Sequence, residues 1–128
     1  MTSPGTVAII GASNDRRKYG NKAVRAYVAA GWRVVPVHPA ETSVEGIPAV
    51  AGLGDLDLQP DCVALYVPPA VGVALLPAIA ARGTRKLWVN RGAESAELMH
   101  AAERLQLPVT YGCAIRSLGL SPQQFPDT

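Results

Sequence analysis

The sequence predicts an α/β fold: a single doubly wound parallel sheet of about five strands in a three-layer α/β/α arrangement. Three observations support this prediction. Five short runs are rich in apolar residues, and the runs at 7–10 and 62–67 are apolar throughout, as in strands that are buried on both faces. Segments with apolar residues at helical spacing separate these runs, which favours parallel strands joined by right-handed crossovers. The length of 128 residues, without an internal repeat, is typical of one domain, so we expect a single domain over residues 1–128.

The expected strands end at glycine, proline or a short polar residue. The first run leads into Gly11, and the second contains Pro36. Because a proline has no amide hydrogen to donate to a neighbouring strand, Pro36 predicts an edge strand or a bulge. The strand ranges are 7–10, 33–38, 62–67, 86–90 and 108–112.

Three helices are expected between these strands. Gly31 is a candidate C-terminal cap of the first helix and Gly83 of the second. Pro77 lies inside the second helix, where proline is tolerated at a kink or close to the helix start. The third helix is amphipathic. The helix ranges are 20–31, 70–82 and 94–105.

The remaining segments show no clear period. Residues 41–58 contain a turn signal at Glu45–Gly46 and a candidate one-turn helix near residues 53–56. The tail from about residue 117 contains prolines and glutamines, so we expect it to be partly ordered or flexible.

Composition and charge exclude several function classes. A formal net charge of +2 is too small to indicate a nucleic-acid-binding protein by itself. The sequence contains no uninterrupted run of 18 apolar residues, which a membrane span would require, and its first residues lack the pattern of a signal peptide. A cytoplasmic location is therefore expected. Cys62 and Cys113 are too few and too far apart to indicate a zinc site, and we expect no metal.

The turn after the first strand is the candidate binding element. Gly11 has no Cβ, which allows a ligand to approach the backbone closely. If a helix follows, its free amide groups and its dipole form an anion site at that turn. In a parallel sheet the other strand ends meet at the same edge, so a ligand is expected there. A tight turn without a ligand is the alternative interpretation.

A dinucleotide site is poorly supported, although the predicted fold is Rossmann-like. The dinucleotide fingerprint requires three glycines, but here Ser13 follows Gly11 at the second position. His38 stands where an acidic residue for the ribose is expected, and Glu41 lies beyond it. An NAD(P)-dependent or other nucleotide-binding enzyme therefore remains only an alternative.

Five motifs in order resemble the CoA-binding domain family. They are Val-Ala-Ile-Ile-Gly-Ala-Ser-Asn, Val-Val-Pro-Val-His-Pro, Gly-Ile-Pro-Ala-Val, Leu-Tyr-Val-Pro-Pro and Leu-Trp-Val-Asn-Arg-Gly, and they extend over residues 6–113. The family includes small stand-alone bacterial CoA-binding proteins and the N-terminal domain of the succinyl-CoA synthetase alpha subunit. The chain departs from many stand-alone members at Tyr111–Gly112, where they carry an acid and an arginine before the late cysteine.

The resemblance implies that coenzyme A or an acyl-CoA binds at the strand ends. It assigns the phosphates to the first turn and nearby basic residues, and the adenosine to the second strand end. The third and fourth strand ends would line the rest of the ligand. The implied binding residues are Gly11, Ala12, Ser13, Asn14, Arg16, Lys18, Lys22, Val37, His38, Pro39, Val67, Pro68, Val71, Asn90 and Gly92.

Several of these residues also have simpler interpretations. The basic residues between Arg16 and Lys22 could lie on a solvated loop, and His38 could only cap a strand. Cys113 could be a structural cysteine or a reactive thiol. No catalytic constellation is evident, so we expect a binding protein and not an enzyme. A homo-oligomer, a larger acyl-CoA-handling partner and an interaction subunit without ligand all stay open.

Overall fold

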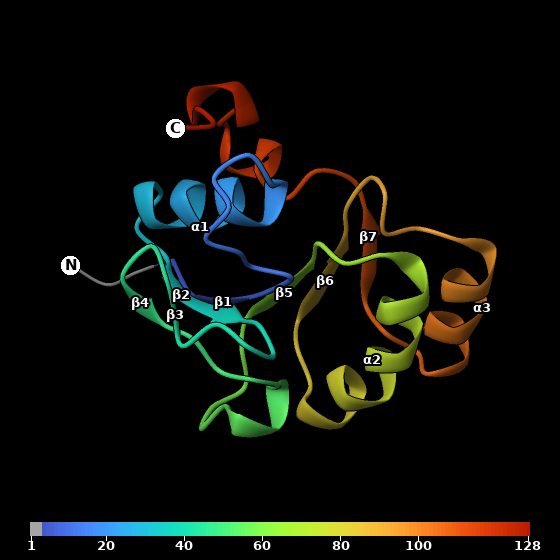
Figure 1. The fold of residues 1–128 in the computed structure, drawn as a ribbon. Coiled ribbons are helices and arrows are strands. Elements are labelled where there is room, and N and C mark those ends of the chain that lie inside the picture. Colours follow the sequence, from blue (N-terminus) through green and yellow to red (C-terminus); the bar gives the residue numbers. More distant parts are fainter. Residues whose placement is uncertain (1–3) are drawn as a thin grey trace.

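A parallel five-stranded sheet runs through the middle of the molecule, in the order β2-β1-β5-β6-β7 (Figure 1). The computed structural model describes residues 4–128. The strand order reverses between β1 and β5, because the chain leaves β1 towards β2 and later returns to β5 on the other side. The sheet strands are β1 (Thr6–Ile10), β2 (Arg33–Val37), β5 (Cys62–Leu65), β6 (Lys86–Val89) and β7 (Val109–Tyr111).

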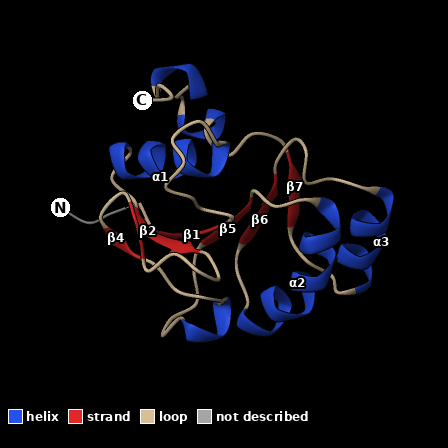
Figure 2. Ribbon diagram, in the orientation of Figure 1, coloured by secondary structure: helices blue, strands red, loops and turns tan. Residues whose placement is uncertain are grey.

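Helices cover both faces of the sheet (Figure 2). On β1, Val7 and Ile9 pack under α1, whereas Ala8 and Ile10 belong to the core on the side of α2 and α3. The strand residues alternate between the two faces because successive side chains point in opposite directions. This confirms the predicted three-layer α/β fold. The helices are α1 (Tyr19–Ala29), α2 (Pro69–Arg82) and α3 (Ala96–Arg104).

The five predicted strands and three predicted helices are confirmed, with small differences at their ends. The third strand stops at Leu65, two residues early, because the chain turns there to enter α2 with Pro68 as its N-cap. Pro77 lies within α2, which continues to Arg82, and its side chain is exposed. The helix then ends at Gly83, whose φ of 82° suits glycine.

The predicted position of Pro36 at an edge strand is confirmed. β2 is the outer strand of the sheet, with β1 as its only partner strand among the described residues. On its outer side the Val50 amide donates to the carbonyl of Pro36, and the His38 amide donates to the carbonyl of Val50. Residues 49–50 therefore cover part of this edge without forming another long strand.

A small hairpin replaces part of the expected irregular segment. β3 (Ser43–Val44) pairs antiparallel with β4 (Ile47–Pro48), and the predicted turn joins them. Glu45 and Gly46 both have positive φ values, of 51° and 77°, as a two-residue hairpin turn requires. The predicted one-turn helix is a 3₁₀ helix at Leu53–Asp55.

The C-terminal tail from residue 117, for which the sequence left partial order and flexibility open, packs against α1. It contains two short 3₁₀ helices, Arg116–Leu118 and Pro122–Gln124, and lies on the same side of the sheet as α1 (Figure 1). Pro122 is buried, and Phe125 packs against the core under α1. The tail lacks a helical period because short turns and apolar anchors, not a long helix, hold it in place. Among the described residues, no helix is long and apolar enough to cross a membrane.

Candidate functional site

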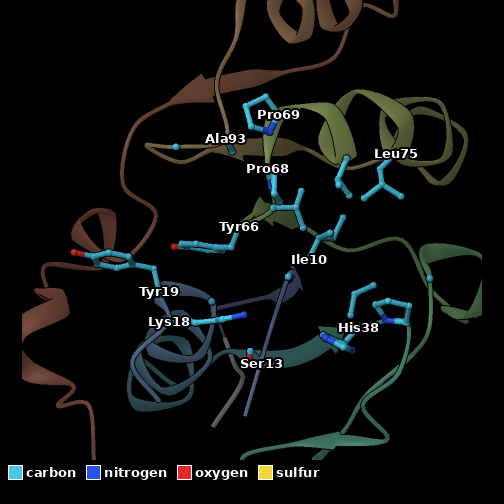
Figure 3. A pocket seen from close by; sticks show the side chains of 18 of the residues that line it. Ile10, Ser13, Lys18, Tyr19, His38, Tyr66, Pro68, Pro69, Leu75 and Ala93 are labelled. Carbon is cyan, nitrogen blue, oxygen red and sulfur yellow. The ribbon is translucent and has the colours of Figure 1, made fainter. Parts of the chain in front are cut away.

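A cavity of about 800 Å³ opens at the carboxyl ends of the strands, where the strand order reverses (Figure 3). Parallel α/β proteins bind their ligands at this position. Its lining comes from the ends of β1, β2, β5 and β6, from the first turn of α1, from α2, and from residues 51–53. The lining residues are Ile10, Gly11, Ser13, Lys18, Tyr19, Gly20, Val37, His38, Pro39, Ala51, Gly52, Leu53, Tyr66, Val67, Pro68, Pro69, Val71, Leu75, Ala78, Arg91, Gly92 and Ala93.

Close backbone packing shapes the turn between β1 and α1. Gly11 has a φ of 92°, and a Cβ placed on it would overlap the carbonyl oxygen of Tyr66 and lie 2.8 Å from its carbonyl carbon. A Cβ on Gly20 would in turn overlap the carbonyl oxygen of Gly11. Both positions therefore require glycine, and the first turn of α1 is held directly against the end of β1.

Two helix N-termini face the cavity. The backbone amides of Tyr19 and Gly20, in the first turn of α1, have no hydrogen-bond acceptor among the described residues. The same holds for Ala70 and Val71 in the first turn of α2, which follows Pro69. Free amides and the positive end of the helix dipole favour an anionic ligand.

The charged side chains that line the cavity are basic. Lys18 and Arg91 are exposed and make no ion pair with a described residue. Among the residues that the structure describes, no carboxylate belongs to the lining. Figure 3 shows Lys18 and His38 extending into the same part of the cavity, near Ser13. The site is therefore electrostatically suited to a ligand with several negative charges.

The His38 ring is oriented by the loop that follows it. Its Nδ1 accepts hydrogen bonds from the amides of Ala40 and Glu41, both at 3.0 Å. A neutral ring in this arrangement carries its hydrogen on Nε2, which is the nitrogen left free to donate to a ligand. His38 thus caps its own loop and also offers one donor at the β2 end of the cavity.

The opposite wall of the cavity is apolar. Val67, Pro68 and Val71 come from the end of β5 and the start of α2, and Leu75 continues this surface along the helix. Val71 is among the most exposed large apolar side chains of the protein, with 46% of its surface accessible. An apolar wall beside an anion site favours a ligand that has both a charged part and an apolar part.

Ten of the residues predicted from the sequence line this cavity. They come from four different strand ends, which the sheet brings to one edge as expected. They are Gly11, Ser13, Lys18, Val37, His38, Pro39, Val67, Pro68, Val71 and Gly92.

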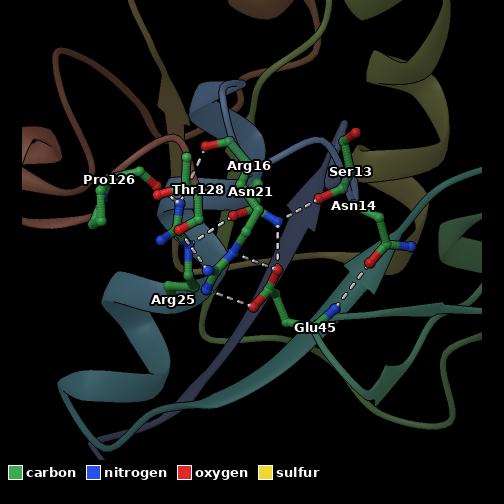
Figure 4. Close-up of polar contacts among 8 residues, drawn as sticks. All are labelled: Ser13, Asn14, Arg16, Asn21, Arg25, Glu45, Pro126 and Thr128. Carbon is green, nitrogen blue, oxygen red and sulfur yellow. Dashed lines mark hydrogen bonds and ion pairs between the residues drawn. The ribbon is translucent and has the colours of Figure 1, made fainter.

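Three polar residues that the resemblance assigns to the phosphates are absent from the cavity lining, and Figure 4 shows the contacts that two of them, Asn14 and Arg16, make instead. Asn14 donates to Glu41 at 2.9 Å and to the carbonyl of Ser43 at 2.7 Å. Arg16 forms an ion pair with Glu45 at 3.1 Å and donates to the C-terminal residue, Thr128. Lys22, predicted from its place in a basic loop, is buried under the tail.

The ammonium group of Lys22 has two oxygen partners from that tail. It donates to the carbonyl of Phe125 and to the carboxylate of Asp127, both at 2.6 Å. Arg25 donates to the carbonyl of Pro126 in the same way, at 2.8 Å. The basic residues of α1 therefore bind the tail.

Glu45 connects the hairpin to the start of α1. It accepts hydrogen bonds from the side-chain amide of Asn21 at 2.9 Å and from the Arg16 guanidinium. These contacts lower the pKa of Glu45, with the Asn21 hydrogen bond as the largest cause, followed in the same direction by Arg16. The carboxylate holds the loop between β1 and α1 from outside the cavity.

Ala12 and Asn90 also lie outside this cavity, although their neighbours line it. Ala12 is fully buried in the core beneath α1. Asn90 is buried and uses both ends of its amide, donating to the carbonyl of Leu65 at 3.0 Å and accepting from the amide of Ala114 at 2.9 Å. Asn90 therefore joins two strand ends and the loop after β7.

The residues predicted from the sequence did not include Arg91, the basic residue that lines the cavity on its β6 side. Arg91 follows Asn90 directly at a strand end, and this position was the available signal. Tyr19, Gly20 and Tyr66 were missed as well, although Tyr19 precedes a predicted helix, Gly20 begins it and Tyr66 lies near the end of a predicted strand. Among the described residues, no group of histidines, cysteines and carboxylates could hold a metal ion.

The two cysteines differ in their surroundings. Cys62 is buried in β5, where burial raises the pKa of its thiol to about 11. Cys113 is partly exposed and lines a second cavity beside the first. Both are free thiols.

Comparison with known proteins identifies similar sequences and folds. A family model described as "CoA binding domain" matches residues 5–118. The structure of a conserved hypothetical protein from Pyrococcus furiosus is similar, with a TM-score of 0.81 and 30% sequence identity, over 88% of this chain and 97% of that one. A Thermus thermophilus protein gives a TM-score of 0.80 and 28% identity, over 88% of this chain and 89% of that one.

A larger enzyme contains a domain of the same fold. The dinucleotide forming acetyl-coenzyme A synthetase 1 of Ca. Korarchaeum cryptofilum, solved in complex with phosphate and ADP, has a TM-score of 0.72 and 22% identity. The match covers 84% of this chain but 25% of that one. At this identity the similarity concerns the fold of one part of the enzyme.

Proposed function

The chain belongs to the CoA-binding domain family, and we propose that it binds coenzyme A or an acyl-CoA in the cavity at the ends of β1 and β5. One observation carries the proposal. Two helix N-termini and the cations of Lys18 and Arg91 converge on a cavity whose lining contains no carboxylate. CoA carries a pyrophosphate and a 3′-phosphate, which amides and basic side chains bind through charge-assisted hydrogen bonds.

The proposal assigns each part of the ligand to one part of the cavity. The pyrophosphate binds beside Gly11, where the free amides of Tyr19 and Gly20 and the side chain of Lys18 face the cavity. The adenosine lies at the β2 end, near His38. The pantetheine arm then follows the apolar wall that begins at Val67 and continues to the β6 end.

The end of β2 favours CoA over NAD. A dinucleotide site places a free carboxylate there for the ribose hydroxyls. In this protein the position is taken by His38, and the nearby carboxylate of Glu41 accepts a hydrogen bond from Asn14 at 2.9 Å. That interaction directs Glu41 towards the hairpin.

We propose a cytoplasmic binding protein and not an enzyme. The candidate nucleophile and the candidate base of the main cavity are both engaged in local turns. Ser13 Oγ accepts a hydrogen bond from the Asp15 amide at 3.0 Å, and His38 Nδ1 accepts from two loop amides. These interactions support a positioning role for both side chains.

A thermal-shift titration with CoA, dephospho-CoA, NAD and ATP tests the proposal. A ligand at about 100 times its Kd adds roughly 2.7 kcal/mol to the stability of the folded protein. For a domain of this size, this raises Tm by on the order of 10 °C. We expect this shift with CoA. No shift with CoA or any acyl-CoA would refute the proposal, and a shift with NAD alone would favour a dinucleotide enzyme.

Replacing Lys18 tests the position of the phosphates, and a neighbouring residue provides a matched control. We expect Lys18→Gln to weaken CoA binding roughly tenfold, because a hydrogen bond to a charged group contributes about 1.5 kcal/mol. Arg17→Gln removes the same charge from the next residue, which pairs with Asp15 at 2.9 Å outside the cavity. Isothermal titration calorimetry should show near-normal affinity for this control. Equal losses in both variants would indicate only a general effect of charge.

A further inference from the structure

A second cavity of about 480 Å³ adjoins the first at its β6 end. The two cavities share the lining residues Tyr19, Tyr66, Arg91 and Gly92, so they meet at the β6 end. The remaining walls come from the loop after β7 and from the C-terminal tail. Its lining residues are Tyr19, Tyr66, Asn90, Arg91, Gly92, Cys113, Ile115, Arg116, Pro122 and Gln123.

The second cavity is lined by two arginines and no carboxylate. Arg91 lies where the two cavities meet, whereas Arg116 lines the second cavity only. Both side chains are exposed, and neither forms an ion pair or a hydrogen bond with another described residue. Two guanidinium groups without anionic partners in a concave surface favour a carboxylate or a phosphate as a ligand.

Tyr66 contributes an unsatisfied polar group at the wall between the cavities. Its hydroxyl oxygen is buried and has no hydrogen-bond partner in the described part of the chain. Figure 3 shows its ring extending in the direction of the Tyr19 side chain. A buried hydroxyl without a partner is unusual in a folded protein, and a bound polar ligand is one way to satisfy it.

We propose that the second cavity holds the acyl group of an acyl-CoA and selects an acyl chain that ends in a carboxylate. This inference rests on the proposed function. With the adenosine at the β2 end and the pyrophosphate between the two helix N-termini, the thioester end of the ligand points to β6. There the terminal carboxylate pairs with Arg116, and Arg91 lies where the two cavities meet.

The test compares two acyl-CoA ligands of equal chain length that differ in the terminal charge. Affinities for CoA, dephospho-CoA, glutaryl-CoA and pentanoyl-CoA are measured by calorimetry on the full chain. We expect glutaryl-CoA to bind about tenfold more tightly than pentanoyl-CoA, because the arginine–carboxylate pair is charge-assisted. Arg116→Gln should abolish this preference and leave the affinity for CoA unchanged. Arg104→Gln removes an exposed arginine of α3 that lines neither cavity, so it should preserve the preference.

The possible outcomes separate this inference from the proposed function. If CoA binds but the two acyl-CoA ligands bind equally, the acyl site is refuted and the CoA site stands. If Arg116→Gln weakens CoA but not dephospho-CoA, Arg116 binds the 3′-phosphate, and the acyl assignment is wrong. If none of the four ligands binds, the proposed function fails and the inference fails with it.

The alkylation rate of Cys113 provides a second measurement at the same place. Cys113 lines the second cavity only, and the buried Cys62 serves as an internal reference. At equal saturation of the protein, glutaryl-CoA should protect Cys113 from iodoacetamide more strongly than S-methyl-CoA, whose blocked sulfur does not consume the reagent. The excess protection should disappear in Arg116→Gln. Equal protection by the two ligands would place the acyl group outside this cavity.

Discussion

Replacing Gly11 with alanine tests how the site is built. Two independent costs follow from the structure. The φ of 92° is unfavourable for any residue with a Cβ, at a cost of roughly 1–3 kcal/mol. The new methyl group would also overlap the carbonyl oxygen of Tyr66 and lie 3.0 Å from Cγ1 of Val67. Because a backbone group cannot move aside easily, this overpacking adds roughly 1–3 kcal/mol.

We therefore expect Gly11→Ala to lower the free energy of unfolding by about 2–6 kcal/mol, the sum of these two costs. Urea denaturation followed by circular dichroism measures the loss. The expected loss is a large fraction of the total stability of a domain of this size. In the fraction of molecules that stays folded, the clash should displace Tyr66 at the end of β5, and we expect this displacement to weaken CoA binding.

Two other glycines separate strain from overlap. Gly92 has a similar φ of 96°, but a Cβ on it meets nothing within 4 Å, so Gly92→Ala should show the strain alone. Gly20 has no unusual φ, but its Cβ would overlap the carbonyl oxygen of Gly11, so Gly20→Ala should show the overlap alone. If Gly11→Ala costs no more than Gly92→Ala, the close contact between the ends of β1 and β5 is not needed for stability.

Three further predictions concern side chains around the site. The folded protein lowers the pKa of Glu45, so the ionised Glu45 side chain stabilises the fold above its ordinary pKa of 4.5, and this stabilisation is lost as the pH falls through the lowered pKa. The urea midpoint should therefore fall less between pH 7 and pH 3 in Glu45→Gln than in the unmodified chain. Tyr66→Phe should raise the stability of the ligand-free protein by about 1 kcal/mol, because it removes a buried hydroxyl without a partner, and a lower Tm would contradict this. Asn90→Ala should lower the free energy of unfolding, measured by urea denaturation, by about 2–4 kcal/mol, because it leaves the carbonyl of Leu65 and the amide of Ala114 without their partners. A loss below about 1 kcal/mol would show that water replaces the side chain.

Much of the fold and about half of the cavity lining follow from local sequence patterns. Continuous apolar runs predict buried parallel strands, and Pro36 identifies the strand at the edge. Once the strands are parallel, their carboxyl ends must share one edge, so residues such as Gly11, His38 and Pro68 are brought together by topology alone. These inferences succeed because they depend on the backbone and on the period of apolar residues.

The partners of the charged residues depend on segments far away in the sequence. Arg16 and Lys22 are basic residues near the first turn, as expected of a phosphate-binding loop. In the folded protein Arg16 pairs with Glu45 of the hairpin, and Lys22 pairs with Asp127 of the tail. Arg91 has no such partner among the described residues and stays open to the cavity. A basic side chain can bind a ligand more readily when no carboxylate or carbonyl of the protein already binds it. The sequence by itself thus determined which strand ends meet at one edge of the sheet, and the tertiary structure decided which basic side chains line the cavity there.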